Sequence, residues 1–91
     1  MNSDAKNFVR YALSIGAIEL VPEGRKLKSG RISYYFFNSG LFRTGEALWY
    51  LASAYASAIH QFKFEILFGP AYKGIPLSAG TAMILHKEFG I

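Results

Sequence analysis

Cysteine is absent from this chain of 91 residues, and no stretch of it reaches the length of a membrane span. Without cysteine there is no disulfide, no thiolate nucleophile and no cysteine-based zinc site, which fits a reducing cytosol. A span needs about 18 consecutive apolar residues. The N-terminus also lacks the basic start and apolar run of a leader segment. We therefore expect a soluble, unprocessed cytoplasmic protein that does not enter a membrane.

The usual residue sets of hydrolytic and metal-dependent enzymes are also missing. The sequence has no Ser, His and Asp set, no pair of carboxylates at catalytic spacing and no GxxxxGKS or GxxxxGKT phosphate loop. His60 and His86 stand alone, with no second histidine or carboxylate at ligand spacing. We expect both histidines to be structural or exposed, and we expect no nucleophilic catalysis from these residues.

Apolar and aromatic residues, in contrast, are abundant for so short a chain. Hydrophobic residues make up 52% of it and aromatic residues 16%. A chain of this size buries only about 60–65% of the surface that it exposes when unfolded, so some apolar surface should face a partner. The formal net charge of +4 favours anionic ligands, and composition alone does not separate nucleic acid from smaller anions.

Hydrophobic periodicity and turn residues predict three helices, a hairpin and a buried strand. Apolar residues at spacings of three and four indicate helices, and β-rich runs around a Ser-Gly pair indicate a hairpin. Candidate caps support the helix boundaries: Asn2 or Ser3 and Gly16 for the first helix, and Thr44 for the second. The predicted elements are a helix over 4–15, strands over 18–27 and 32–37 joined by 28–31, a helix from Thr44 to about residue 61, a strand over 65–69 and a helix over 74–88.

The stretch LFGPAYKGIP, residues 67–76, is the most informative part of the sequence. A short apolar run ends at a Gly-Pro pair, as expected of a central strand covered on both faces, and a helix follows with Pro76 in its first turn. The loop 70–74 should point its backbone N–H groups, the positive end of the helix dipole and the Lys73 ammonium at one small volume. This chemistry suits phosphate or pyrophosphate, although so short a pattern also fits an ordinary strand-to-helix turn.

Cations and aromatic rings gather around the predicted hairpin. Four cations surround its turn: Arg25, Lys26, Lys28 and Arg31. They fit a solvated hairpin tip or an edge strand protected from pairing with other chains, and only one of them need have a function. The run YYFFN from Tyr34 fits core packing by default. Aromatic rings and backbone amides beside a basic turn could also hold a flat anionic ring.

The predicted strand 65–69 lacks the neighbours that it needs. A buried parallel strand needs strands on both sides, and the sequence reaches Gly90-Ile91 where the next strand of a βαβ unit should begin. Unpaired strand edges and an uncovered apolar face would make an isolated segment marginal. We therefore interpret these residues as the N-terminal part of a larger fold, and expect residues 1–91 alone to aggregate or stay poorly ordered.

Two long motifs, LKSGRISYYFFNSGLFRTG at 27–45 and ILFGPAYKGIPLSAGTA at 66–82, closely resemble the N-terminal half of orotate phosphoribosyltransferases. The opening helix, within NFVRYALSIGAIEL, also fits the start of that family. The resemblance implies an α/β fold, the N-terminal part of a phosphoribosyltransferase-type, Rossmann-like fold with a β-hairpin hood, truncated after the first core strand and helix. It assigns residues 1–43 to the N-terminal helix and hood, and residues 44–91 to the first helix-strand-loop-helix part of an incomplete core domain.

Enzymes of this family transfer phosphoribosyl from 5-phosphoribosyl-1-diphosphate (PRPP) to orotate, and release pyrophosphate and orotidine 5′-monophosphate in pyrimidine biosynthesis. By resemblance, Lys28 would be the hood lysine that contacts the phosphorylated ligand, and the backbone region of Phe36 and Phe37 would hold orotate. Tyr72 and Lys73 would contact PRPP in the pyrophosphate loop. The resemblance also implies Mg²⁺ bound mainly through PRPP, a homodimer, and neither a nucleic acid nor a membrane as partner.

Some features of the resemblance differ or are missing. Tyr34 stands where the family commonly has proline and Ile32 where lysine is frequent, and neither is a ligand position. The mobile catalytic loop, the Asp-Asp PRPP motif and a later orotate-contacting arginine are not in these residues, so the segment alone should be inactive. The pyrophosphate loop should contain a non-proline cis peptide bond near Ala71–Tyr72.

Other interpretations remain open. A phosphoribosyltransferase for another base is one, although the FFN motif of the hood favours orotate. A naturally short, non-catalytic module for anion binding or subunit association is another. A basic nucleic-acid binder is the last, although no recognised pattern for single-strand binding is present.

Overall fold

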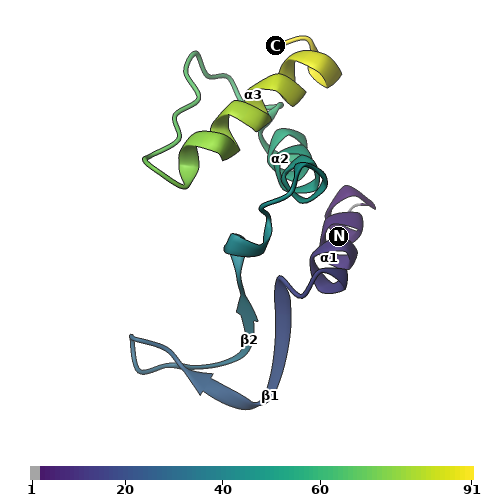
Figure 1. The fold of residues 1–91 in the computed structure, drawn as a ribbon. Coiled ribbons are helices and arrows are strands. Elements are labelled where there is room, and N and C mark those ends of the chain that lie inside the picture. The colour runs from purple at the N-terminus through teal and green to yellow at the C-terminus, as the bar shows by residue number, and fades with distance from the viewer. Residues whose placement is uncertain (1–2) are drawn as a thin grey trace.

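The computed structural model describes residues 3–91, and Figure 1 shows helices with a two-stranded hairpin projecting from one end. The elements are α1 (Ser3–Ser14), β1 (Ile18–Lys26), β2 (Ile32–Phe37), the short 3-10 helix η1 (Ser39–Leu41), α2 (Gly45–Ile59) and α3 (Gly74–Phe89). Helix α2 packs against both α1 and α3. In the described part of the chain, no helix is long and apolar enough to cross a membrane.

Helix α1 begins and ends close to the predicted bounds. The candidate cap Asn2 lies outside the described residues, and Ser3, the other candidate, is already in the first turn of α1. Gly16 follows the last turn with a φ of +79°, a left-handed conformation that glycine adopts without steric cost. The Ala17 N–H donates to the Ala12 carbonyl at 2.8 Å, and this hydrogen bond leads the chain from α1 into β1.

The predicted hairpin is present, and its strands run antiparallel. Its turn is closed by hydrogen bonds from the Leu27 N–H to the Arg31 carbonyl at 2.8 Å and from the Gly30 N–H to the Leu27 carbonyl at 2.9 Å. The pairing shifts between Leu20 and Arg25, where β1 is irregular. The turn therefore forms where its Ser-Gly pair predicts it.

Helix α2 is capped as the sequence predicts. The Thr44 hydroxyl accepts a hydrogen bond from the Ala47 N–H at 3.0 Å and so satisfies one of the free donors at the helix start. The helix ends at Ile59, slightly before the predicted end. Its buried residues are alanines, and a Cβ at Gly80 of α3 would lie only 3.4 Å from the Ala52 Cβ, so the two helices approach closely.

Residues 65–69 do not form the strand that the sequence predicts. They run as irregular chain, and within residues 3–91 only β1 and β2 pair. A strand is held by hydrogen bonds to a neighbour, and no other described strand lies beside this segment. Two of its large side chains are not covered either, since Ile66 is 82% exposed and Phe68 is 79% exposed. The expectation of a strand covered on both faces is therefore wrong for this structure.

Helix α3 confirms the predicted helix over 74–88 and extends it to Phe89. Pro76 lies in its first turn, where the missing N–H costs no helical hydrogen bond. The His60 ring stacks on the Phe89 ring with centroids 3.9 Å apart, and His86 is exposed. Both histidines are exposed, and His60 also makes this ring contact, so both positions agree with the expectation.

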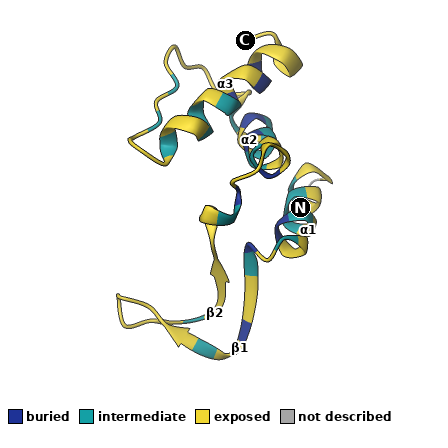
Figure 2. Ribbon diagram, viewed as in Figure 1, coloured by how far each residue is buried: buried dark blue, intermediate teal, exposed yellow. Residues whose placement is uncertain are grey.

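Two small apolar cores share α2 (Figure 2). The first core joins α1, the base of the hairpin and the start of α2, and its buried residues are Ala12, Ala17, Phe42 and Ala47. The second core joins α2 to α3, and its buried residues are Ala52, Ala56, Ile84 and Leu85. Many larger apolar side chains stay exposed, as the composition predicts, among them Leu20, Tyr35, Trp49 and Met83.

Tyr11 fastens α1 to α2. Its ring stacks on the Tyr50 ring with centroids 3.8 Å apart, and its hydroxyl donates a hydrogen bond to Glu46 Oε1 at 3.1 Å. Partial burial, together with the hydrogen bond to the Glu46 carboxylate, raises the pKa of Tyr11 above its ordinary value of 10.0. The phenol therefore stays protonated, and keeps its hydrogen bond, at neutral pH.

Candidate functional site

Two glycines bracket the loop before α3 and bring its ends together. A Cβ at Gly69 would overlap the Gly74 carbonyl oxygen and the Ser78 hydroxyl, and a Cβ at Gly74 would lie 2.8 Å from Pro70 Cδ. A hydrogen bond from the Gly74 N–H to the Pro70 carbonyl, at 2.9 Å, closes the loop. Glycine at both positions therefore permits the tight turn that sets residues 71–73 at the start of α3.

The tip of this loop has the predicted conformation, with one exception. The peptide bond between Ala71 and Tyr72 is cis, as expected. Within the described chain, the N–H groups of Ala71, Tyr72 and Lys73 have no hydrogen-bond partner, so they remain available to a ligand. The Gly74 N–H was also expected to face the ligand, and this expectation is wrong because the closing hydrogen bond to Pro70 uses it.

Lys73 carries the positive charge of this loop. It occupies the N-cap position of α3 but makes no side-chain cap hydrogen bond. Its side chain is exposed beside the positive end of the helix dipole. The ammonium and the unpartnered N–H groups therefore gather at one end of α3, as the sequence predicts.

The hairpin places its predicted site residues apart from one another. The ring of Phe37 lies against the body of the molecule, with its centroid 5.8 Å from that of Phe42. Phe36 precedes it in β2 and takes the opposite face, where the Arg25 guanidinium lies 4.6 Å from its ring centroid. Lys28 lies in the exposed turn at the hairpin tip.

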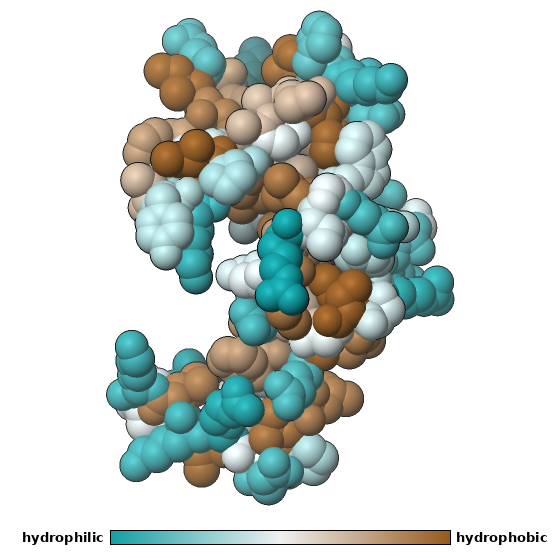
Figure 3. All heavy atoms as spheres, in the orientation of Figure 1, coloured by the Kyte–Doolittle hydropathy of each residue, from teal (hydrophilic) through white to brown (hydrophobic). Residues whose placement is uncertain are grey.

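One cavity joins the hairpin to the loop. Its volume is about 540 Å³, and it opens between β2, α2 and the start of α3, where Figure 3 shows the surface hollowed. Phe37, Tyr72 and Lys73 line it, whereas Lys28 and Phe36 are not among the described lining residues. The structure therefore brings three of the five predicted contact residues together. In Figure 1 the hairpin turn and the loop before α3 reach toward the same side of the molecule.

Arg43 is a second cation of this cavity, and the sequence interpretation missed it. It directly precedes Thr44, so the start of α2 holds its backbone at the cavity. The available signal was its place at the end of the first long motif, next to a helix cap. Among the described residues that line the cavity, two are cations and none is a carboxylate. The cavity therefore favours an anionic ligand.

The same lining does not fit a metal ion held by protein side chains. Mg²⁺ takes oxygen ligands and is usually held by one or two carboxylates. The described lining residues include no carboxylate, and residues 3–91 contain no group of three His, Cys, Asp or Glu side chains that could hold a metal. A metal at this cavity would depend on oxygen atoms that the ligand supplies.

Comparison with known proteins gives consistent similarities. The chain is 51% identical over 85 residues to an orotate phosphoribosyltransferase of Pseudomonas putida strain W619, a match that covers 91% of this chain and 39% of that protein. It is 48% identical over 87 residues to an orotate phosphoribosyltransferase of Bordetella avium, with 93% of this chain and 39% of that protein covered. No protein-family model matches the chain.

A solved structure gives the same result for the fold. The chain superposes on a crystal structure of orotate phosphoribosyltransferase from Francisella tularensis with a TM-score of 0.80 and 48% identity, over 92% of this chain and 42% of that one. The chain thus spans about two fifths of the length of these relatives. The predicted resemblance, and with it the N-terminal, hairpin-bearing part of this α/β fold, is confirmed.

Proposed function

We propose that this relative of orotate phosphoribosyltransferases supplies part of the site that transfers phosphoribosyl from PRPP to orotate. The products would be orotidine 5′-monophosphate and pyrophosphate, in the biosynthesis of pyrimidines. The observation that supports this most is the cavity that brings Phe37 of the hairpin together with Tyr72 and Lys73 of the loop. Its aromatic and cationic lining suits a flat anionic base beside a diphosphate.

The loop side of the cavity suits the diphosphate. Lys73 and Arg43 offer charge-assisted contacts, and the unpartnered N–H groups of residues 71–73 offer further donors to phosphate oxygens. We assign Tyr72 and Lys73 as contacts to PRPP on this basis. Arg43 joins them because it lines the same cavity.

The hairpin side suits the base. We assign the backbone region of Phe36 and Phe37 to orotate, with the Phe37 ring forming part of the cavity wall. Lys28 is assigned to the phosphorylated ligand through the LKSG motif alone, since it lies at the exposed hairpin tip outside the lining. The two sides of the cavity would thereby hold PRPP and orotate next to each other, in position to react.

The chemistry needs no nucleophile from these residues. A bond forms between the ring nitrogen of orotate and ribose C1, and that nitrogen gives up its proton to solvent, while the bond from C1 to the diphosphate oxygen breaks and its electron pair leaves with pyrophosphate. Positive charge develops on the ribose and negative charge on the departing diphosphate, so donors that are already in place lower the barrier. Lys73 suits that task, and we propose that Mg²⁺ arrives bound to the PRPP diphosphate, because the protein side of the cavity offers it no carboxylate.

We further propose the division into a helix and hood, residues 1–43, and the first part of a core domain, residues 44–91. The exposed apolar side chains of Ile66 and Phe68 support the existence of a covering partner or segment. A homodimer working in the cytoplasm, without nucleic acid or membrane, completes this proposal.

The test uses the protein expressed from its complete reading frame and measures pyrophosphate release from PRPP and orotate with Mg²⁺. Lys73→Ala should lower kcat/KM for PRPP about 100-fold, because a cation is lost from a site where negative charge develops. Lys87→Ala is the matched control, since it removes the same charge from the far end of α3, outside the cavity lining. It should change kcat/KM by less than about twofold.

Equal losses in the two lysine variants would reject the placement of the site. Residues 1–91 alone should release no pyrophosphate. A non-catalytic module for anion binding or subunit association is the second candidate, which the exposed side chains of Ile66 and Phe68 favour. That candidate predicts Lys73-dependent binding of pyrophosphate with no release from PRPP and orotate by the complete protein.

A further inference from the structure

A second cavity lies behind the loop that precedes α3. Its volume is about 330 Å³, and residues of α2, of α3 and of the segment 67–70 line it. We call it the rear cavity, and the cavity that joins the hairpin to the loop the front cavity. The described lining of the rear cavity has no charged side chain, whereas the front cavity has Arg43 and Lys73. An anionic ligand is therefore held in the front cavity.

The loop has open space behind both of its ends. Gly69 and Pro70 at its start and Gly74 at its end all line the rear cavity. The hydrogen bond from the Gly74 N–H to the Pro70 carbonyl joins the two ends to each other. The position of residues 71–73 relative to the front cavity therefore depends on the side chains of α2 and α3 that stand beside this space.

Three residues are common to the linings of the front and rear cavities, namely Tyr55 of α2 and Gly74 and Leu77 of α3. Glycine has no side chain, so the side chains of Tyr55 and Leu77 form the partition between the two spaces. Leu77 is half-buried and lies in the first turn of α3. A helical side chain points back toward the residues three and four positions before it, which for Leu77 are Gly74 and Lys73. Leu77 is thus the part of the partition that lies at the end of the loop.

We propose that Leu77 is a positioning residue for PRPP, a role that rests on the phosphoribosyl transfer proposed above. Together with the Tyr55 ring, it keeps the front cavity closed from the rear cavity. It thereby holds the unpartnered N–H groups of residues 71–73 and the Lys73 ammonium at the diphosphate. A misplacement of about 1 Å is enough to slow a reaction severely. A shorter side chain at position 77 would join the two cavities and let the loop move back.

The test uses the protein expressed from its complete reading frame and measures pyrophosphate release from PRPP and orotate with Mg²⁺. Leu77→Ala should lower kcat/KM for PRPP about tenfold and change KM for orotate by less than about twofold, because the loop faces PRPP. Leu77→Met restores the lost volume and should recover most of the activity. Leu77→Val removes less volume, so it should show a loss of about threefold even if the alanine variant fails to fold.

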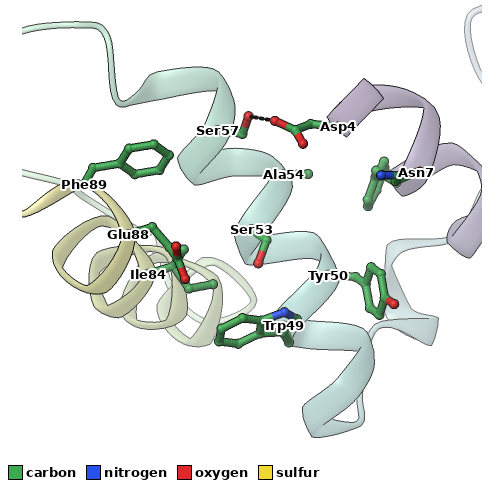
Figure 4. A pocket seen from close by; sticks show the side chains of 11 residues that line it. Asp4, Asn7, Trp49, Tyr50, Ser53, Ala54, Ser57, Ile84, Glu88 and Phe89 are labelled. Carbon is green, nitrogen blue, oxygen red and sulfur yellow. Dashed lines mark hydrogen bonds between the residues drawn. The ribbon is translucent and has the colours of Figure 1, made fainter. Parts of the chain in front are cut away.

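Ile84→Ala is the matched control, because it also shortens an aliphatic side chain of α3. Ile84 is 5% exposed and lines a separate cavity between α1, α2 and α3, as Figure 4 shows. No described residue of that cavity's lining also lines the front or the rear cavity. Ile84→Ala should therefore lower the melting temperature at least as much as Leu77→Ala, yet change kcat/KM for PRPP by less than about twofold.

Binding of pyrophosphate gives a readout that does not require transfer. Calorimetric titration with pyrophosphate and Mg²⁺ should show a Kd about fivefold higher for Leu77→Ala than for the unchanged protein, because the donors are less well preorganised. Ile84→Ala should leave this Kd unchanged. If Lys73→Ala kept full activity, the proposed function would lose its site, and these Kd values would still test the support that Leu77 gives to the loop.

Three outcomes would overturn the role of Leu77 and leave the proposed function intact. In the first, Lys73→Ala loses activity and Leu77→Ala does not. In the second, Leu77→Met is as impaired as Leu77→Ala. In the third, Ile84→Ala raises the Kd for pyrophosphate as much as Leu77→Ala does, because the effect would then follow the stability of α3 and not the partition.

Discussion

The first core, beneath the hairpin, is tied together by ring stacking and hydrogen bonds, whereas the second core is a contact of aliphatic side chains, without aromatic rings, between α2 and α3. In the first core the Phe8 and Phe42 rings stack with centroids 5.7 Å apart, and the Asn38 N–H donates to the Ala17 carbonyl at 2.7 Å. In the second core, Leu67 from the irregular segment between α2 and α3 packs against the buried side chains. The first core therefore fixes the chain around it, and the second leaves most of its loop uncovered.

Two apolar segments, one near each core, show how this difference affects the formation of a strand. Residues 32–37 and 65–69 are both rich in apolar side chains and are both predicted to be strands. The first segment pairs with β1, and no described strand pairs with the second. Similar composition thus gives different structure, because a strand depends on a neighbouring backbone more than on its own side chains.

The largest expected effect is on the first core. Phe42 is only 7% exposed and contacts two other rings, so Phe42→Ala should lower the free energy of unfolding by about 3–5 kcal/mol. Phe62→Ala is the control, because Phe62 is 61% exposed, and it should cost less than about 1 kcal/mol. Urea unfolding measures both. A greater loss from Ile84→Ala than from Phe42→Ala would reverse the comparison of the two cores.

A smaller effect is expected in the loop of the second core. Gly69→Ala would force its Cβ into the Gly74 carbonyl and the Ser78 hydroxyl, so it should cost about 2 kcal/mol and move the loop. Gly45→Ala is the matched control, since a Cβ there meets nothing within 4 Å. Thermal unfolding compares the two variants, and equal melting temperatures would show that the loop can relax freely.

Loss of the N-terminal cap of α2, the helix that both cores share, should destabilise the protein less. Thr44→Ala removes the side-chain cap of α2 and should destabilise the protein by about 1 kcal/mol. Thr44→Ser keeps a hydroxyl that can accept the Ala47 N–H and should restore most of the loss. If the serine variant were as unstable as the alanine variant, the hydroxyl would not be the cause.

The smallest expected effect is a change of stability with pH, and it arises where Tyr11 fastens α1 to α2. The pKa of Tyr11 is raised in the folded protein, so its contribution to stability is complete below about pH 10 and is lost as the pH rises through the folded value. The protein loses stability at alkaline pH, and Tyr11→Phe should remove the part of this loss that deprotonation of Tyr11 causes. Melting temperatures from about pH 8 to about pH 12 measure it. Parallel curves for the two proteins would contradict the assignment.

The elements that could be predicted from the sequence are those with local causes. The hairpin follows from its turn, α2 from the Thr44 cap and the end of α1 from Gly16. The loop could also be predicted, because an apolar run stops at Gly69-Pro70 and Pro76 suits the first turn of a helix, and Lys73 lies where expected. The cis bond is present as well, but its expectation came from the family resemblance and not from local residues.

The remaining features depend on contacts between distant parts of the chain. The predicted strand at 65–69 needs a partner that its own residues do not specify. Arg43 enters the cavity because β2, the start of α2 and the start of α3 all contribute to its lining, which no local pattern encodes. The family resemblance assigns the backbone region of Phe36 and Phe37 together, yet adjacent strand residues take opposite faces, and of these two rings only that of Phe37 lines the cavity.

The close approach of α2 and α3 also controls the width of the cavity that joins the hairpin to the loop, although the two helices meet away from that cavity. Helix α3 has 16 residues and is therefore about 24 Å long, and Gly80 meets Ala52 about two fifths of the way along it. A larger side chain at either position would tilt α3 about the other contacts of the second core. Lys73 would then move relative to Phe37, although neither residue had been changed. Two of the smallest side chains in the protein thus set the spacing between the two halves of its candidate site.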